Sequence, residues 1–240
     1  MAVRRPAYVA VADHLREMIL AGALPAGERL PTEAELGAQF GVSRSTIREA
    51  LKMLSSIRLV ATSRGVSGGS MVTVGNPDDV SKLLQVGITQ LTAAEKCTVD
   101  ELLQTREMLE VPAARLAARL RDSAQINLLS EAIPRSLADV DSGRLFELNR
   151  MFHRVILEAS GNRLLPVLTE PIFYVLQTRF LRDRATPEFW RDVNLQHALI
   201  LEAVGLGDEE LAGSRMQDHL RQLGTTYRSI DSHRRRSAAS

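Results

Sequence analysis

Two short helical patterns separated by a glycine decide the fold of the N-terminal part of this chain. The first runs Leu30-Pro31-Thr32-Glu33-Ala34-Glu35-Leu36, and the second runs Phe40-Gly41-Val42-Ser43-Arg44-Ser45-Thr46-Ile47-Arg48-Glu49-Ala50-Leu51. Thr32 and Glu35 have the spacing of a capping box at a helix start, Gly41 suits a turn, and Ser43 can cap a second helix. The pattern predicts a helix-turn-helix.

The outward face of the second helix carries side chains that suit DNA binding. Ile47, Leu51 and Leu54 recur at helical spacing and are predicted to pack inward. This spacing leaves a polar group facing outward near the helix N-terminus: Arg44, Ser45, Thr46 and Arg48. Arginine binds guanine edges or phosphates, small hydroxyl side chains allow close approach, and a helix N-terminus attracts phosphate. We predict that these four residues contact DNA, and the alternative is an ordinary amphipathic surface helix.

Two β-prone runs follow the second helix and predict a wing. Residues 59–62 and 71–74 flank a glycine-rich segment at 63–70, and a β-hairpin at this place makes a winged helix-turn-helix. Arg64 and Gly65 lie near its tip, where glycine permits close approach of the backbone and a narrow minor groove attracts arginine. We predict that both residues contact DNA, and a plain flexible hairpin is the alternative.

Together these motifs resemble the DNA-binding domain of the GntR family of bacterial transcription regulators. The resemblance runs from Tyr8 to Val74 and includes the segments 24–33 and 42–51 and the wing glycines. It implies that the family's DNA contacts fall on Arg44, Ser45, Thr46, Arg48 and Gly65. An arginine that some members place early in the first helix of the motif is replaced here by Ala34. We therefore expect one operator contact to be missing.

Length and composition indicate a soluble protein of two domains. The chain has 240 residues, of which 45% are hydrophobic and 4% aromatic, and a domain usually takes about 100 to 200 residues. No apolar run is long enough to span a membrane, and the first residues lack the apolar segment of a signal peptide, so we expect a cytoplasmic protein. Cys97 is the single cysteine, which excludes an intrachain disulfide and a cysteine-based zinc cluster.

The small net charge of +1 is divided unevenly along the chain. Residues 1–75 hold nine basic and six acidic side chains, a net charge of +3, and the remainder carries −2. A mildly basic first domain is consistent with contacts to phosphate, although the imbalance alone does not establish them.

The sequence beyond residue 75 predicts an all-α domain. Gly75-Asn76-Pro77-Asp78-Asp79 stops the wing strand and marks a linker at 76–80. The helical patterns beyond it cover 80–93, 99–121, 123–141, 143–160, 163–185, 187–205 and 208–230, each with boundaries uncertain by about 2 to 4 residues. Pro112, Pro134 and Pro171 fall inside these patterns and are expected to kink or split them.

The predicted fold is therefore mainly α. It has a winged helix-turn-helix domain at 1–75 and an all-α bundle of about seven helices at 81–230. The basic run at 231–240 has no apolar periodicity and is expected to be a disordered tail.

Three histidines and an asparagine in the helical domain are candidate metal ligands. Asn149 and His153 are four residues apart and share one helix face, while His197 and His219 lie on two later helices. Three imidazoles and one oxygen that converge inside a bundle can hold Zn²⁺ or another borderline divalent ion with open coordination positions. The competing interpretation is that these are ordinary helix histidines, on the surface or hydrogen-bonded in the core.

The same region resembles the FCD effector domain of FadR-type GntR regulators, through the segments 101–118, 149–162, 197–208 and 216–220. The resemblance implies a metal site at Asn149, His153, His197 and His219, and a contact between Arg106 and an effector carboxylate. Arg150, Gln177 and Arg179 are further candidates for effector contacts. Asn149 stands where aspartate is commonest, so the ligand set lacks one negative charge. We expect zinc, with nickel or manganese as the alternatives.

Both resemblances imply a DNA-binding regulator whose helical domain senses a small organic acid. We expect a homodimer that binds a pseudo-palindromic operator in double-stranded DNA, represses transcription, and releases the operator when the acid binds at the metal and Arg106. There are two alternatives. One is a metal-dependent, hydrolase-like helical domain that activates water, and the other is an effector-independent DNA-binding dimer with a structural metal.

Overall fold

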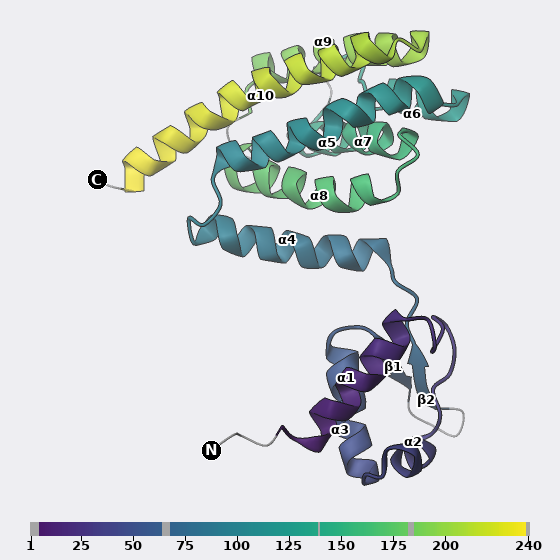
Figure 1. Cartoon of the computed structure of the whole chain (residues 1–240). Helices are drawn as coiled ribbons and strands as arrows, with labels where there is room; N and C mark the ends of the chain where they lie inside the picture. The colour runs from purple at the N-terminus through teal and green to yellow at the C-terminus, as the bar shows by residue number, and fades with distance from the viewer. Residues whose placement is uncertain (1–4, 64–67, 139, 182–184, 239–240) are drawn as a thin grey trace. The chain divides into compact units, whose positions relative to one another are not determined.

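The computed structural model describes residues 5–63, 68–138, 140–181 and 185–238. The chain divides into two compact units, Met1–Asn76 and Pro77–Ser240. Figure 1 shows the helices and strands of both units. Each unit buries a hydrophobic core of its own.

The N-terminal unit contains three helices: α1 (Ala7–Leu20), α2 (Glu33–Phe40) and α3 (Arg44–Ser56). The predicted capping box starts α2, because the Thr32 side chain accepts from the Glu35 amide and the Glu35 carboxylate accepts from the Thr32 amide. Gly41 ends α2 in the left-handed region, with a φ of 63°, where glycine meets no steric cost. Ser43 caps α3 by accepting from the Thr46 amide. The predicted helix-turn-helix is confirmed.

Two strands, β1 (Val60–Ser63) and β2 (Gly69–Val72), form an antiparallel hairpin in which Val60 pairs with Val72. The predicted runs at 59–62 and 71–74 are offset from these strands by one and two residues. Both valines are buried in one core with Leu36 and Ile47, so the hairpin packs on the helices as a wing. The predicted DNA contacts Arg64 and Gly65 lie outside the described residues.

Seven α-helices make up the described part of the C-terminal unit, as predicted, with a π-helical segment, η1 (Gln177–Leu181), after α8. They are α4 (Pro77–Ala93), α5 (Val99–Leu120), α6 (Ser123–Glu131), α7 (Ser142–Ala159), α8 (Leu164–Leu176), α9 (Pro187–Leu206) and α10 (Glu209–Ala238). α5 packs against α7, α8, α9 and α10. Its face toward them carries fully buried alanines, which let helix backbones approach closely: Ala113, Ala114, Ala117 and Ala118.

Two of the three prolines do not split their helices. Pro112 lies inside α5 and Pro171 inside α8, and neither ends its helix. A proline in a helix costs about 3 kcal/mol, and the burial of neighbouring residues such as Ala113 and Ile172 offsets this cost. Pro134 lies beyond the end of α6 at Glu131, so the helix expected over 123–141 is shorter.

The ends of the C-terminal unit also differ from the expected boundaries. α4 begins at Pro77, so residues 77–80 of the expected linker are helical, because proline is favoured at the first helical position. α10 continues to Ala238, where the sequence predicts a disordered tail from residue 231. Extending a helix costs little once its earlier turns are packed, and Leu223 and Tyr227 on those turns are buried.

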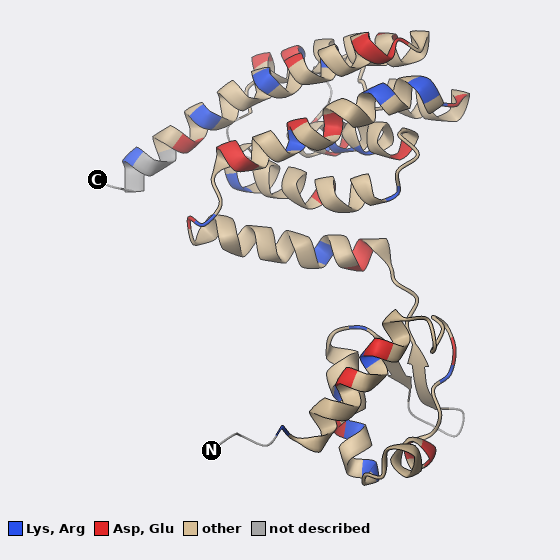
Figure 2. Cartoon of the chain, in the orientation of Figure 1, with Lys and Arg blue, Asp and Glu red and all other residues tan. Residues whose placement is uncertain are grey.

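None of the helices among the described residues has the length and apolar character needed to cross a membrane. Acidic and basic side chains are interspersed along the helices of both units (Figure 2).

Candidate metal centre and DNA-binding face

The predicted DNA-binding residues lie together at the start of α3. Arg44, Ser45 and Arg48 are exposed and Thr46 is half-buried. The Ser43 hydroxyl lies 2.8 Å from the hydroxyls of both Ser45 and Thr46, which orders the small polar side chains at this helix end. Ala34 is exposed on α2 and has no side chain that could reach a phosphate.

Arg48 has a partner that the sequence analysis missed. Its Nη2 and Nε donate to the two carboxylate oxygens of Glu33 at 2.8 and 3.2 Å, across the turn between α2 and α3. This hydrogen bond and the charge of Arg48 lower the pKa of Glu33. The predicted contact of Arg48 with DNA therefore requires that it exchange this carboxylate for a phosphate.

Replacing Arg44 with alanine is expected to weaken operator binding by about 1–3 kcal/mol, because an exposed arginine at the start of a recognition helix contacts a base or a phosphate. The measurement is fluorescence anisotropy on an operator selected from random-sequence DNA. Arg16→Ala is the control, since Arg16 on α1 pairs with Asp13 on the same helix. Equal operator affinity of Arg44→Ala and the wild type would exclude Arg44 from the DNA contact.

The three predicted histidines converge in the core of the C-terminal unit. His153 lies on α7, His197 on α9 and His219 on α10, and each is at most 2% exposed. One ring nitrogen from each can be chosen so that all three lie within 4.8 Å of one another. The Nε2 atoms of His153 and His219 are only 3.2 Å apart. The predicted convergence is therefore present in the fold.

Two of these rings have an oxygen acceptor at Nδ1, the ring nitrogen that is not directed at the other histidine. Glu110 Oε2 lies 2.6 Å from His153 Nδ1, and Gln196 Oε1 lies 2.7 Å from His219 Nδ1. A carboxylate can only accept, so His153 carries its proton on Nδ1, and the amide oxygen requires the same of His219. Both Nε2 lone pairs then point toward the same space, an arrangement that a cation between them stabilises.

His197 and Asn149 complete the group. The His197 ring stacks on Phe152 with 3.8 Å between centroids, and its Nε2 has no hydrogen-bond partner among the described residues. Asn149, one turn before His153 on α7, is 4% exposed, and its Oδ1 is also unpartnered. A buried oxygen and a buried ring nitrogen without partners cost free energy. A ring nitrogen of His197 lies within 4.8 Å of donor atoms of the other two histidines, and Asn149 lines a small cavity together with His197. This set of donor atoms fits a divalent ion of the kind that takes imidazole and oxygen ligands.

The electrostatics keep these rings neutral, as ligation requires. Burial lowers the pKa of His197 and of His219 well below the usual histidine value. The neighbouring histidines and Arg106 lower both further, and Glu110 opposes this effect at His219. Burial also lowers the pKa of His153, against the opposing effect of Glu110. Neutral imidazole is the form that binds a metal.

Arg106 lies in the same core and is already paired. Its Nε and Nη2 donate to the Glu110 carboxylate at 2.6 and 3.2 Å, and its guanidinium lies 4.9 Å from the centre of the Phe173 ring. Burial alone would raise the pKa of Glu110, but Arg106 and His153 lower it below its usual value, so the carboxylate is charged. Only Nη1 of Arg106 lacks a partner among the described residues, and it is the atom that can receive a ligand.

The other three candidate effector residues are not brought to the histidines in the same way. Arg150 and Gln177 line an open surface pocket of about 350 Å³ whose lining includes Tyr174 but none of the three histidines. Arg179 is half-buried on η1, with its guanidinium 6.0 Å from the Phe180 ring. A narrow cavity of about 10 Å³ reaches Asn149 and His197 between hydrophobic side chains.

Sequence reasoning missed Glu110 and Gln196 as parts of the site. Glu110 is four residues after Arg106 and shares its helix face, which is a local signal. Gln196 precedes His197 but contacts His219 on another helix, and no spacing in the sequence indicates that pairing.

Comparison with known proteins agrees with this two-part architecture. Residues 7–68 match the family model described as bacterial regulatory proteins, gntR family, and residues 101–222 match the FCD domain. A solved structure titled "Streptococcus agalactiae GntR" is 25% identical, with a TM-score of 0.60, and the alignment covers 91% of this chain and 99% of that one.

Three relatives are similar over nearly their whole length. The "Glc operon transcriptional activator" of Escherichia coli is 28% identical over 95% of this chain and 91% of its own. The "Putative L-lactate dehydrogenase operon regulatory protein" of Escherichia coli is 30% identical over 95% and 89%. The "HTH-type transcriptional repressor NanR" of Citrobacter rodentium is 28% identical over 92% and 85%.

These relatives are regulators, which excludes the hydrolase alternative. The winged helix-turn-helix, the buried histidine group and the two domain matches lead to one assignment. The chain belongs to the GntR family of bacterial regulatory proteins and, with its FCD domain, is a transcriptional regulator and not an enzyme.

Proposed function

We propose that this regulator is a cytoplasmic homodimeric repressor that releases its operator when a small organic acid binds beside a divalent metal ion. The ligands are Asn149, His153, His197 and His219, and zinc is the ion, with nickel or manganese as the alternatives. The observation that carries the proposal is the buried cluster of inward nitrogen lone pairs and unpartnered polar atoms. When bound, the ion supplies positive charge and open positions for an acid oxygen.

The residues around the cluster favour a small anion. Arg106 Nη1 is buried, charged and unpartnered among the described residues, so a carboxylate that reaches it gains a charge-assisted hydrogen bond. The Arg106–Glu110 pair is neutral as a whole, and the four ligands carry no charge, so no anionic ligand in the site repels the acid. The cavity at Asn149 and His197 has about 10 Å³, room for about one water molecule, so an acid has to displace side chains when it binds.

The names of the relatives support a hydroxy acid as the effector, and they include both an activator and a repressor. One relative is named for an L-lactate dehydrogenase operon, and lactate is a small 2-hydroxy acid. The hydroxyl and carboxylate of such an acid can chelate one ion. One relative is named an activator and another a repressor. We propose repression here. A repressor dimer that leaves its operator when the acid binds can switch transcription without binding a further partner.

Coupling between the two sites requires that the acid bind the DNA-competent and DNA-incompetent states with different affinity. The residues of the cluster lie on α7, α9 and α10, and Arg106 lies on α5, so an acid that enters contacts side chains from four packed helices. A dimer presents two recognition helices to half-sites of a pseudo-palindrome. The coupling free energy between the acid site and the DNA-binding site then determines how far the acid lowers the affinity for the operator.

The test is an operator gel shift with a panel of 2-hydroxy acids, sugar acids and dicarboxylates, in the presence and absence of a metal chelator. We expect one acid to weaken operator binding by roughly 5- to 150-fold, and the chelated protein not to respond. Arg106→Gln is expected to lose the response, while the exposed control Arg163→Gln keeps it. If chelation lowers thermal stability and no acid changes operator affinity, the metal is structural and the proposed sensing function is wrong.

A further inference from the structure

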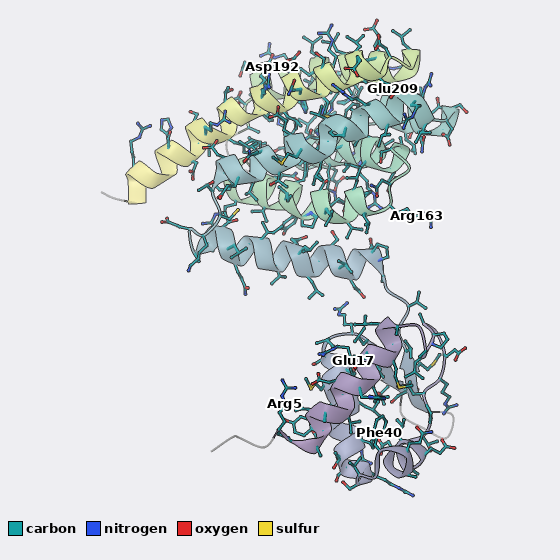
Figure 3. The ribbon with its side chains drawn as sticks, viewed as in Figure 1. Arg5, Glu17, Phe40, Arg163, Asp192 and Glu209 are labelled. Atoms are coloured by element: carbon teal, nitrogen blue, oxygen red, sulfur yellow. The ribbon has the colours of Figure 1, made fainter. Side chains whose placement is uncertain are left out.

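A chain of three hydrogen bonds leads from the protein surface to His219. The Asp192 carboxylate accepts from Gln222 Nε2 at 3.4 Å, Gln222 Oε1 accepts from Gln196 Nε2, and Gln196 Oε1 faces His219 Nδ1 at 2.7 Å. Asp192 and Gln222 are exposed, Gln196 is half-buried and His219 is fully buried. Asp192 lies on the outer side of the helices (Figure 3). The chain therefore joins solvent to a candidate metal ligand.

Each group in this chain fixes the orientation of the next. The Asp192 carboxylate has no proton to donate, so the amide nitrogen of Gln222 faces it and the amide oxygen of Gln222 faces inward. That oxygen requires the amide nitrogen of Gln196, which turns the Gln196 oxygen toward the imidazole. An oxygen beside Nδ1 requires the proton of His219 to be on Nδ1. Nε2 is then left with a free lone pair.

We propose that Asp192, Gln222 and Gln196 are positioning residues that set the tautomer of His219 and so prepare its Nε2 to bind a metal. Glu110 does the same for His153 in one step, since its carboxylate contacts Nδ1 directly. The proposal rests on the proposed metal centre. It adds that one of the ligands is controlled from the surface, through two neutral amides that connect α9 and α10.

The alternative arrangement shows why the outer carboxylate matters. If both amides were turned over, Gln196 would donate to Nδ1, and the proton of His219 would move to Nε2. That proton would point at His153 Nε2, 3.2 Å away, and would block ligation. With both amides turned over, the Gln222 oxygen would also face the Asp192 carboxylate, and two acceptors repel each other. Asp192 is the group that makes one arrangement the stable one.

The test measures the tautomer directly in the metal-free full chain. Nitrogen-15 NMR of histidine-labelled protein, at a pH where the rings are neutral, distinguishes a protonated Nδ1 from a protonated Nε2. We expect His219 to carry the proton on Nδ1 in the wild type, and to shift toward Nε2 in Asp192→Asn and Gln222→Met. A second measurement is Zn²⁺ affinity by competition with a chromophoric chelator.

The expected loss in Zn²⁺ affinity is largest for the residue that contacts the His219 ring and smaller for the residues farther from it. Gln196→Leu removes the direct acceptor and is expected to lower the affinity roughly 10- to 100-fold. Gln222→Met removes two exposed hydrogen bonds, and Asp192→Asn replaces a group that can only accept by one that can also donate. Both are expected to lower the affinity about 2- to 10-fold. Gln217→Met is the matched control, because Gln217 lies on the same helix and donates to a carboxylate, Glu107, that does not lead to a histidine.

Rescue separates positioning from packing. Glu at position 196 can only accept, so it keeps the Nδ1 proton without help from Gln222. The double variant Gln196→Glu with Gln222→Met is therefore expected to retain the wild-type tautomer and Zn²⁺ affinity. An unchanged tautomer in Asp192→Asn, Gln222→Met and Gln196→Leu, or an Nε2 proton in the wild type, would overturn the proposal. If the wild type binds no Zn²⁺, the metal centre fails, while the NMR result still decides whether the chain sets the tautomer.

Discussion

Glu110→Ala is expected to lower the free energy of unfolding of the helical unit by about 3–5 kcal/mol. The substitution leaves the Arg106 guanidinium fully buried without its carboxylate and removes the acceptor behind His153. An unpaired charge in a core costs far more than a lost surface ion pair. Urea unfolding followed by the fluorescence of Trp190 measures this effect, because the single tryptophan of the chain is buried in that unit.

Two further variants identify the cause of the loss. Glu107→Ala removes a carboxylate from the same helix at a partly exposed position and is expected to change stability by less than about 1 kcal/mol. Arg106→Met combined with Glu110→Leu removes both charges, and apolar replacement of a whole buried pair is often neutral or stabilising. If the double variant is as unstable as Glu110→Ala, lost packing and not an unpaired charge accounts for the effect.

His219→Ala is expected to abolish stoichiometric metal binding. In our proposal His219 supplies one of three imidazoles, and alanine leaves no donor atom in that position. Metal analysis after dialysis against Zn²⁺ is expected to give about one ion per wild-type chain and none for the variant. The ion also stabilises the folded state, by about 4 kcal/mol at a free concentration 1,000 times Kd, so Zn²⁺ should raise the Tm of the wild type and leave that of His219→Ala unchanged.

The control for this prediction lies on the same helix. His233 is an exposed histidine of α10 whose Nδ1 lies 2.7 Å from the Ser229 carbonyl oxygen, and His233→Ala is expected to bind metal as the wild type does. Unchanged stoichiometry in His219→Ala would refute the proposed centre. A Zn²⁺-dependent Tm that disappears only in His233→Ala would place the ion on the surface of α10.

Sequence reasoning succeeded where local chemistry determines structure. Thr32 and Glu35 make a capping box from four consecutive residues, and Gly41 and Ser43 mark the turn without reference to the rest of the fold. Asn149 and His153 share a face because a helix has a fixed period. The convergence of His197 and His219 on that face followed from the resemblance, since spacing along one helix says nothing about its neighbours.

The remaining features depend on tertiary contacts. Gln196 and His219 are 23 residues apart and on different helices, and Arg48 pairs with Glu33 across a turn. Arg150 follows the candidate ligand Asn149 directly in sequence, yet it lines a separate surface pocket together with Gln177. Neither the type of these two residues nor their spacing in the sequence indicates on which side of a helix layer they lie.

The ion pair between Glu33 and Arg48 has a consequence for how a regulator that contacts DNA through Arg48 would find its operator. A chromosome offers an enormous excess of competing sites, and affinity for them comes almost entirely from phosphate neutralisation. An arginine that already has a carboxylate partner gains little free energy when it exchanges that partner for a phosphate of unrelated sequence. The exchange also leaves the unpaired carboxylate close to the negatively charged duplex. If Arg48 contacts DNA as predicted, the pair is expected to shorten the time spent on unrelated sequence and to let a modestly basic domain search more of the genome for each operator it occupies.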